Sequence, residues 1–345
     1  MSEIPPQPLA PLPNRPRLGV AMTTHNGSRF VKAQIRSILS QDLPVDEIVI
    51  GDDDSTDNTV ESVQQLVDAH NAATDHPVTL VWRKHRPALG IRDNFSDAIS
   101  ATSADVVFLS DQDDEWAPHK TTVLTAELAD TELVHTDAIL IDAEGAPLGS
   151  PERPRTLLET LKASTWEITN LTEGNAFPVL LKRNLITGAT VAMRGDFARE
   201  NMPVPAGLLH DEWLAMMAAL EGRLRLAGPE TAELTRYRQH GGNAIGAKRI
   251  SLRDRFDQLT SGSGEDNLRR LTRAKSLATS AQKRGLGTPA ARRDLLAALR
   301  HQEARGGLPP HRLARIPKIA KEILNGHYFR YSRGWLTVIR DLFAA

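Results

Sequence analysis

The sequence predicts an α/β protein: a doubly wound, mainly parallel sheet followed by a helical carboxyl-terminal region. Two observations lead to this prediction. From residue 17 onward, short apolar runs alternate with amphipathic stretches in the βαβαβαβ rhythm that is typical of parallel sheets. Beyond residue 247 the chain becomes basic and helical, and residues 248–345 carry 21 basic and 8 acidic side chains. The formal net charge of −1 therefore averages a body of −14 and a carboxyl-terminal region of +13.

Composition excludes several classes of protein. The 345 residues include no cysteine, which excludes disulfides and thiolate metal sites. A bound metal would then be a hard cation such as Mg²⁺ or Mn²⁺, held by carboxylates or histidine. No apolar run reaches the length of a membrane span, and the amino terminus lacks the apolar core of a signal peptide. We expect a cytoplasmic protein, or one that binds peripherally at the inner face of the cell membrane.

The chain divides into three parts by composition. Residues 1–16 contain six prolines and are expected to form a disordered tail, residues 17–248 the sheet-bearing body, and residues 249–345 the basic helical region. The first four strands are expected at Leu18–Met22, Glu47–Ile50, Val78–Trp82 and Asp105–Leu109. Apolar residues at helical spacing predict the intervening helices at Phe30–Leu39, Thr59–Ala69 and Ile91–Ser100. Less regular elements are expected near Leu133–Ile141 (strand), Arg155–Lys162 (helix), Ala189–Met193 (strand), Glu212–Glu221 (helix) and Leu234–Tyr237 (strand).

Three adjacent acids, Asp52, Asp53 and Asp54, follow the second predicted strand. One acid of this segment is explained as a cap of the next helix, with Asp57 or Ser55 at its start. Adjacent carboxylates repel one another unless a cation, a base edge or a ribose shares their charge. We therefore favour a ligand-facing role for Asp52 or Asp53.

A second acidic segment, with Asp111, Gln112 and Asp113 at its start, follows the fourth predicted strand. Ligands of doubly wound folds bind beyond the carboxyl ends of the strands, where one or two carboxylates and substrate phosphates typically hold Mg²⁺ or Mn²⁺. The alternative is a solvated acidic turn. The position of this D-x-D pattern at a strand end favours a metal and diphosphate site.

Two later segments also carry reactive groups. Asp211 opens a predicted helix, where it is either an N-terminal cap or the general base of a displacement reaction. Arg238, Gln239 and His240 follow a predicted strand and offer donors to phosphate oxygens, and His240 is also a candidate metal ligand. The alternative for this second segment is a surface turn.

In this order, the motifs resemble those of the family 2 glycosyltransferases of GT-A fold, in particular a rhamnosyltransferase-like branch associated with polysaccharide biosynthesis of the cell envelope. The resemblance covers about residues 17–248. It rests on Met22–Gly27, Asp52–Asp57, Ser110–Trp116 and Tyr237–Asn243, together with Gln34, Ser37, Gln41, Arg92, Asn94, Phe95, Ile186–Gly188 and His210–Trp213.

The resemblance implies a metal-dependent, inverting transfer of a sugar, such as rhamnose or another hexose. The donor would be a dTDP- or UDP-sugar, the acceptor a glycan or a lipid-linked hydroxyl, and the cofactor Mg²⁺ or Mn²⁺. It makes Asp211 the catalytic base and Asp113 and His240 the metal ligands. It assigns nucleotide-sugar binding to Thr24, Asn26, Asp52, Asp53, Arg92, Asp111, Gln112, Arg238 and His240.

Two residues depart from the family pattern, and two alternative functions stay open. His25 stands where a tyrosine is usual, and Asp54 stands where a glycine is common, which argues against a positive-φ turn there. A sugar-nucleotide nucleotidyltransferase would also use acids at strand ends, but it would ordinarily carry a basic Gly-rich loop after the first strand. A non-catalytic nucleotide-sugar or membrane-binding module is the other alternative, against which intact Asp113 and Asp211 argue.

The basic carboxyl-terminal region allows two interpretations. Its helices either pack on the acidic body or, through the aromatic and basic residues of Ile316–Phe343, contact an anionic membrane surface. Nucleic acid is a competing polyanion, but the region carries no recognised binding motif and the acidic body would repel it. We therefore expect no nucleic-acid partner.

Overall fold

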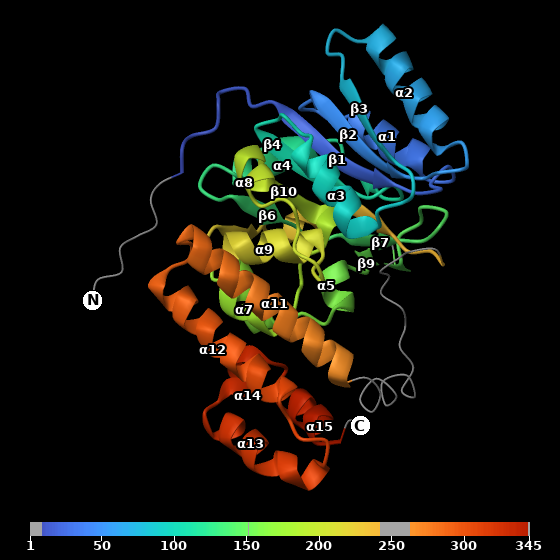
Figure 1. The fold of residues 1–345 in the computed structure, drawn as a ribbon. Coiled ribbons are helices and arrows are strands. Elements are labelled where there is room, and N and C mark those ends of the chain that lie inside the picture. Colours follow the sequence, from blue (N-terminus) through green and yellow to red (C-terminus); the bar gives the residue numbers. More distant parts are fainter. Residues whose placement is uncertain (1–8, 151, 242–262, 344–345) are drawn as a thin grey trace.

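The computed structural model describes residues 9–150, 152–241 and 263–343, and Figure 1 shows a sheet-bearing body above a group of helices. The first half of the expected tail, Gly242 and Asn243 of the glycine-rich turn, and the expected domain boundary at residue 248 lie outside the described residues. Residues 9–16 form no helix or strand. Leu12 packs against the core of the body, and the carbonyl oxygen of Ala10 accepts a hydrogen bond from Arg194.

A seven-stranded sheet organises the body, in the order β11-β6-β10-β4-β1-β2-β3. Its strands are β1 (Leu18–Thr24), β2 (Glu47–Asp53), β3 (Thr79–His85), β4 (Val106–Ser110), β6 (Leu133–His135), β10 (Val191–Arg194) and β11 (Leu224–Leu226). β1 runs parallel to both β2 and β4, as the βαβ rhythm predicts, and β10 runs antiparallel to β4 and β6. The register places Thr24 beside Asp52 and Met22 beside Ser110, so the two acidic segments leave the same sheet edge.

Alternating apolar side chains give the sheet two buried faces. Val20 and Met22 of β1 face one core, together with apolar residues of α1 (Val31–Leu39), α2 (Thr59–Ala73) and α4 (Lys120–Glu127). Ala21 faces the opposite core, together with residues of α3 (Ile91–Ser100), α8 (Gly195–Glu200) and α9 (His210–Leu220). The period of two along β1 therefore produces the doubly wound arrangement.

The middle section differs from the sequence expectation in its strands. The single strand expected over Leu133–Ile141 is two strands, β6 in the main sheet and β7 (Ile139–Ile141) in a second sheet of order β5-β12-β7. β12 (Thr235–Arg238) pairs there with β5 (Glu115–Trp116), which follows the D-x-D segment directly. The remaining short elements are β8 (Gly149–Ser150), β9 (Arg153–Pro154), α5 (Leu157–Thr160), α6 (Thr165–Thr172) and α7 (Phe177–Lys182).

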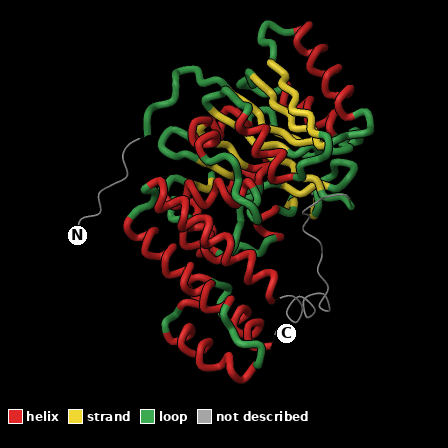
Figure 2. Tube along the Cα trace, in the orientation of Figure 1, coloured by secondary structure: helices red, strands yellow, loops and turns green. Residues whose placement is uncertain are grey.

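The carboxyl-terminal region is entirely helical where it is described, and Figure 2 shows helices without strands below the sheet. Its helices are α11 (Ser263–Arg284), α12 (Pro289–Gly306), α13 (Arg312–Leu324), α14 (His327–Tyr331) and α15 (Trp335–Phe343). Leu277 and Leu295, from α11 and α12, are buried in the same core as residues of α7 and α9. None of the described helices is long and apolar enough to cross a bilayer.

A buried ion pair joins α12 to α15 within this region. The guanidinium of Arg305 donates to both carboxylate oxygens of Asp341, at 2.6 and 2.9 Å, and both residues are buried. Arg305 also donates to the side-chain oxygens of Gln302 and Asn267, at 2.7 Å each, and Tyr328 donates its hydroxyl to Asp341 at 2.9 Å. This network holds α11, α12, α14 and α15 together.

We predict that Arg305→Met destabilises the protein by about 3–5 kcal/mol, because it leaves the Asp341 carboxylate buried without its counter-charge. The double variant Arg305→Met/Asp341→Leu should recover most of that loss, since no buried charge remains. Urea unfolding followed by circular dichroism measures both. A double variant as unstable as the single one would contradict this account of the pair.

Candidate active site

The acidic loop between β4 and β5 lies at the centre of the site. Burial raises the pKa of the Asp111 carboxyl to about 7, and repulsion from Asp113 and Asp211 contributes to the rise. Burial also raises the pKa of Asp114 well above its usual value, with repulsion from the same loop. The fold therefore brings the D-x-D acids and Asp211, a hundred residues apart in sequence, into one electrostatic cluster.

Arg238 fixes the shape of this loop from β12. Its backbone N–H donates to the Asp114 carboxylate at 2.9 Å, and its guanidinium Nε donates to the carbonyl oxygen of Asp113 at 2.7 Å. The guanidinium also pairs with the Glu115 carboxylate and donates to the carbonyl oxygen of Asp142 at 3.0 Å. Because Arg238 is buried and makes these contacts within the protein, it positions the acidic residues.

His240 contacts the D-x-D segment directly. Its Nε2 lies 2.7 Å from the Oδ2 atom of Asp113, and its ring stacks near Phe30 with ring centroids 4.6 Å apart. Histidine nitrogens and carboxylate oxygens are both ligands that divalent transition-metal cations accept. Asp113 and His240, the two residues predicted as metal ligands, therefore lie close enough to bind one ion.

Lys120 is a buried cation beneath the acids that the sequence analysis did not identify. Its ammonium donates to the carbonyl oxygen of Ala189 at 2.8 Å and lies 4.1 Å from the centroid of the Trp116 ring. Burial lowers its pKa to about 7, and the charges of Asp114 and Asp111 oppose that fall. A lysine at the start of α4 has no sequence signal that separates it from a surface lysine, because its burial depends on the packing of distant strands.

Asp211 lies in the first turn of α9. Leu209 occupies the N-cap position of this helix, so Asp211 is not the cap. Its Oδ1 atom accepts the backbone N–H of Glu212 at 2.6 Å, and the N–H of Gly188 also hydrogen-bonds to its carboxylate. Burial nevertheless raises the pKa of Asp211 to about 7, a value suited to a base that works near neutral pH.

The two residues that flank Asp211, His210 and Glu212, are both fixed by contacts with other elements. His210 stacks on Phe95 with ring centroids 3.7 Å apart, and burial lowers the pKa of its ring to about 3, so it stays neutral. Arg273 of α11 pairs with the carboxylate of Glu212 at 3.0 Å and donates to the Leu180 carbonyl oxygen at 2.6 Å. The carboxyl-terminal region therefore packs against the turn that carries Asp211.

A second group of predicted residues forms a hydrogen-bonded shelf at the ends of β1 and β2. The carboxylate of Asp52 accepts hydrogen bonds from the hydroxyls of Thr24 and Ser55, both at 2.7 Å. The backbone N–H of Asn26 donates to the Ser55 hydroxyl at 2.9 Å, and the side-chain oxygen of Asn26 accepts the N–H of Thr56 at 2.9 Å. These predicted residues do lie together, and their contacts fix one another.

Asp53, His25 and Gln112 extend this shelf. The carboxylate of Asp53 accepts the N–H groups of Leu89 and Gly90, at 3.0 and 2.7 Å, so it anchors the loop before α3. The Nδ1–H of His25 donates to the Asp53 carbonyl oxygen at 2.5 Å. The side-chain amide of Gln112 bonds to the backbone N–H and carbonyl of His25, at 2.9 and 3.1 Å, which ties the D-x-D segment to the end of β1.

Asp54 differs from its sequence expectation. Asp54 adopts a φ of 59°, so the positive-φ turn that its side chain was expected to disfavour does form. Aspartate is one of the few residues that tolerate this conformation, and an exposed ion pair with Arg86 at 3.2 Å accompanies it. Arg92, which the sequence predicts to bind the nucleotide sugar, forms an ion pair with its neighbour Asp93 at 2.6 Å, and its predicted role stays a prediction.

Another candidate metal grouping lies elsewhere. Within the described part of the chain, three metal-ligating atoms come within 4.8 Å of one another only at His301, Glu322 and His327. The Glu322 carboxylate lies 2.6 and 2.9 Å from the Nδ1 atoms of the two histidines, which are hydrogen-bonding distances, and the group joins α12, α13 and α14. At the sheet edge, an ion on Asp113 and His240 would need further ligands from a bound substrate, as is usual for Mg²⁺ sites.

Comparisons with known proteins bear on the family and the fold of the chain. Residues 19–194, about half of the chain, match the family described as Glycosyl transferase family 2. An uncharacterised glycosyltransferase of Nostoc sp. is 32% identical over 104 residues, which are 30% of this chain and 30% of that relative. A solved structure of S. aureus TarS 1–349 in complex with UDP-GlcNAc is similar with a TM-score of 0.52 and 13% identity, covering 94% of this chain and 89% of that chain.

A mannosyltransferase of Pyrobaculum calidifontis, solved with GDP-Man and Mn²⁺, is similar with a TM-score of 0.49 and 18% identity. The match covers 98% of this chain and 88% of that one. At 13% identity, the likeness to TarS concerns the fold alone, and that fold is GT-A.

The raised pKa of Asp211 predicts a pH-dependent difference in stability. The folded protein holds this proton up to about pH 7, whereas the usual value is 3.8. The stabilisation from the bound proton is therefore lost progressively as pH rises from about 4 to about 7. Because an amide is never ionised, Asp211→Asn should melt at a higher temperature than the native protein, by a margin that grows between about pH 4 and pH 7 and then levels off.

Thermal melts in EDTA measure this margin. Asp68→Asn, which changes an exposed carboxylate on α2, is the control and should show no pH-dependent margin. A margin for Asp211→Asn that is constant or shrinks as pH rises would show that its carboxyl is not protonated in the folded protein.

Proposed function

The chain belongs to glycosyl transferase family 2, and from that premise we propose that it transfers a hexosyl group, with inversion, from a nucleotide-diphosphate donor to an acceptor hydroxyl. The observation that carries this proposal is the position of Asp211. A buried carboxyl with a pKa of about 7 lies in one cluster with the D-x-D acids. This arrangement supports a proposed base for the acceptor and a proposed metal site for the donor diphosphate at one sheet edge.

In the proposed reaction, Asp211 takes the proton of the acceptor hydroxyl while the hydroxyl oxygen bonds to the anomeric carbon. The bond between that carbon and the diphosphate oxygen breaks, and its electron pair leaves with the diphosphate. A bound Mg²⁺ or Mn²⁺ would supply charge stabilisation for this leaving group. Attack on the face opposite the leaving group inverts the anomeric configuration.

Asp113 and His240 are the proposed metal ligands, and Asp111 would face the same ion and the ribose. The residues present fit such an ion, because Asp111, Asp113 and Asp114 lie together in a buried site and repel one another. Lys120 is a buried cation close to these acids. Because its pKa is lowered to about 7, it is only partly charged near neutral pH and neutralises the acids only in part. For Arg238 we propose a positioning role in place of direct phosphate binding, since its contacts hold the loop of Asp113 and Glu115.

The shelf formed by Thr24, Asn26, Asp52, Asp53 and Gln112 is the proposed nucleoside side of the site. Its internal hydrogen bonds hold the ends of β1, β2 and β4 in fixed positions, which lowers the cost of ordering when a nucleotide binds. We retain a dTDP- or UDP-sugar as the proposed donor. Arg92, at the start of α3, would reach the donor only by exchanging its partner Asp93.

Membership of the family favours sugar transfer over the nucleotidyltransferase alternative, and the assembled base argues against a non-catalytic module. For the acceptor we propose a glycan or lipid-linked hydroxyl at the cytoplasmic face of the membrane. Large apolar side chains exposed in the carboxyl-terminal region support this location, among them Trp335 at 61%, Phe343 at 56% and Leu324 at 87% exposure.

We predict that Asp211→Asn lowers the transfer rate by about 10²–10⁴-fold and leaves donor binding nearly unchanged, because an amide cannot accept the hydroxyl proton. Release of nucleoside diphosphate with acceptor present measures transfer, and calorimetry measures donor binding. Asp68→Asn is again the control. If Asp211→Asn keeps most of its turnover, Asp211 is not the base.

We predict that Asp113→Ala loses the Mg²⁺- or Mn²⁺-dependent part of donor binding, because it removes a proposed ligand of the ion. A thermal-shift screen of dTDP- and UDP-sugars, with each metal and with EDTA, measures this effect. The native protein should be stabilised by its donor more strongly with metal, and the variant equally with metal and with EDTA. A metal-enhanced shift that persists in Asp113→Ala would remove Asp113 from the ligand set.

A further inference from the structure

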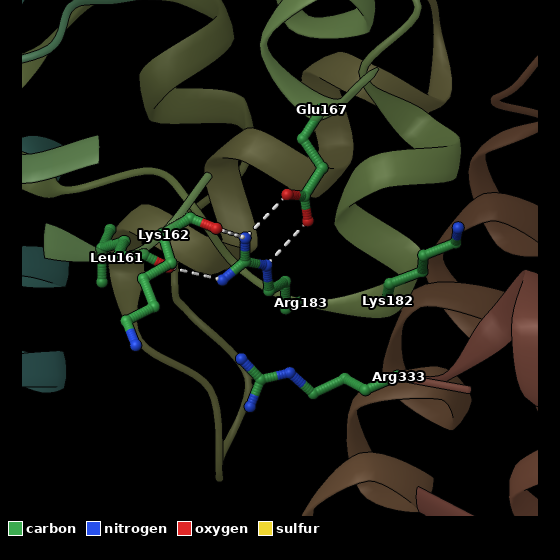
Figure 3. A pocket seen from close by; sticks show the side chains of 6 residues that line it. All are labelled: Leu161, Lys162, Glu167, Lys182, Arg183 and Arg333. Carbon is green, nitrogen blue, oxygen red and sulfur yellow. Dashed lines mark hydrogen bonds and ion pairs between the residues drawn. The ribbon is translucent and has the colours of Figure 1, made fainter. Parts of the chain in front are cut away.

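A basic pocket lies at the junction between the body and the carboxyl-terminal helices. It has a volume of about 290 Å³ and is lined by Leu161, Lys162, Glu167, Lys182, Arg183 and Arg333. Figure 3 shows these side chains, with Arg333 reaching from the carboxyl-terminal side toward residues of the body. Four of the six lining residues are basic and one is acidic, so the pocket carries an excess of positive charge.

Arg183 forms the rigid wall of this pocket. Its guanidinium makes two parallel hydrogen bonds with the Glu167 carboxylate, both at 2.7 Å, and donates to the carbonyl oxygens of Leu161 and Lys162, at 2.7 and 3.0 Å. Glu167 also closes a capping box with Ser164 at the start of α6. The one acidic group of the pocket is therefore committed to Arg183 and Ser164.

Arg333 and Lys162 are the two basic side chains of the pocket that are placed to contact a ligand. In Figure 3 the Arg333 guanidinium extends toward Arg183 and Lys162, whereas Lys182 extends away, with its ammonium 4.2 Å from the Trp166 ring. Partial burial and repulsion from Arg183 and other nearby arginines lower the pKa of Arg333, and attraction to the Glu167 carboxylate opposes that fall. The Arg333 side chain is exposed, so an anion from solution can reach it.

The pocket adjoins an exposed apolar surface. Arg333 lies two residues before Trp335, the first residue of α15, and Trp335 contacts the ring of Phe329 edge-on, with centroids 5.3 Å apart. The outer face of α15, formed by Trp335, Leu336, Ile339 and Phe343, is 46–61% exposed. These residues follow the spacing of one helical face. Aromatic side chains beside cations are typical of proteins that bind at the headgroup level of a membrane.

We propose that this pocket binds the phosphate of an anionic lipid headgroup, held between Arg333 and Lys162, while the outer face of α15 enters the apolar layer. The charge complementarity of the pocket selects phosphate, and the adjoining apolar face selects a lipid over a water-soluble phosphate compound. This inference rests on the membrane location proposed above. Leu161, one wall of the pocket, packs against the small apolar cluster that includes Tyr237, the residue before Arg238.

Flotation with vesicles tests the proposal, using the full chain in EDTA so that the acidic donor site holds no cation. The vesicles contain phosphatidylcholine, either alone or with phosphatidylglycerol. The native protein should bind the phosphatidylglycerol vesicles at least about tenfold more tightly, and Arg333→Gln and Lys162→Gln should each remove most of that preference. Trp335→Ser should weaken binding to both kinds of vesicle.

Arg293→Gln is the matched control, because it removes the same charge from an exposed position on α12 outside the pocket. It should bind phosphatidylglycerol vesicles as the native protein does. Equal losses in Arg333→Gln and Arg293→Gln would overturn the proposal in favour of diffuse attraction, and so would unchanged binding by Arg333→Gln. The melting temperature of Arg333→Gln should stay close to that of the native protein, because the side chain is exposed.

Inorganic phosphate separates the two sources of the anion. Phosphate that competes with vesicles for the native protein but not for Arg333→Gln supports the pocket as the headgroup site. Phosphate binding that depends on Arg333, without any binding to phosphatidylglycerol vesicles, would overturn the lipid assignment. Transfer to a water-soluble acceptor by a protein that binds no vesicles would leave the proposed function standing and refute the lipid site alone.

Discussion

Repulsion among carboxylates at one edge of the main sheet is the constraint around which the structure is arranged. Asp111, Asp113 and Asp114 leave β4 together, and Asp211 approaches them from α9, in surroundings that raise the pKa of Asp111 and Asp211 to about 7. Such a cluster is stable only if fixed groups hold each acid in place. β12 pairs with β5 and β7, and this pairing places Arg238 beside the acidic loop. Both the backbone N–H and the side chain of Arg238 then donate hydrogen bonds to the loop.

The two halves of the site differ in how complete they are. On the proposed nucleoside side, Asp52 already has partners in Thr24 and Ser55, so this half is held in shape by its own hydrogen bonds. On the proposed diphosphate side, the acids remain mutually repulsive, and a cation with its bound phosphates would complete their environment. The first half is therefore formed before any ligand binds, whereas the second half would be completed by the ligand.

The sequence predicted the parts of the molecule that depend on local patterns. The four parallel strands and the acids at their ends follow from alternation and helical spacing, and both acidic segments do meet at one edge. Features that depend on long-range pairing were missed. The split of Leu133–Ile141 into strands of two sheets, the burial of Lys120 and the loop-holding role of Arg238 come from contacts with residues far along the chain. The expectation that Asp54 would disfavour a positive-φ turn was wrong, because aspartate tolerates the left-handed region.

The basic side chains of the carboxyl-terminal region lie on two separate surfaces. The sequence left open whether they pack on the acidic body or face a membrane, and the two surfaces differ in this respect. On α11, Arg273 pairs with Glu212, the neighbour of Asp211, so one set of cations packs on the acidic body. Arg333, beside α15, is exposed and lines an open pocket whose one acidic side chain, Glu167, is paired with Arg183. Packing on the body therefore accounts for the first set of cations and not for Arg333. The proposed lipid phosphate would give Arg333 a counter-charge, and the exposed apolar face of α15 favours a membrane lipid over a water-soluble phosphate as its source.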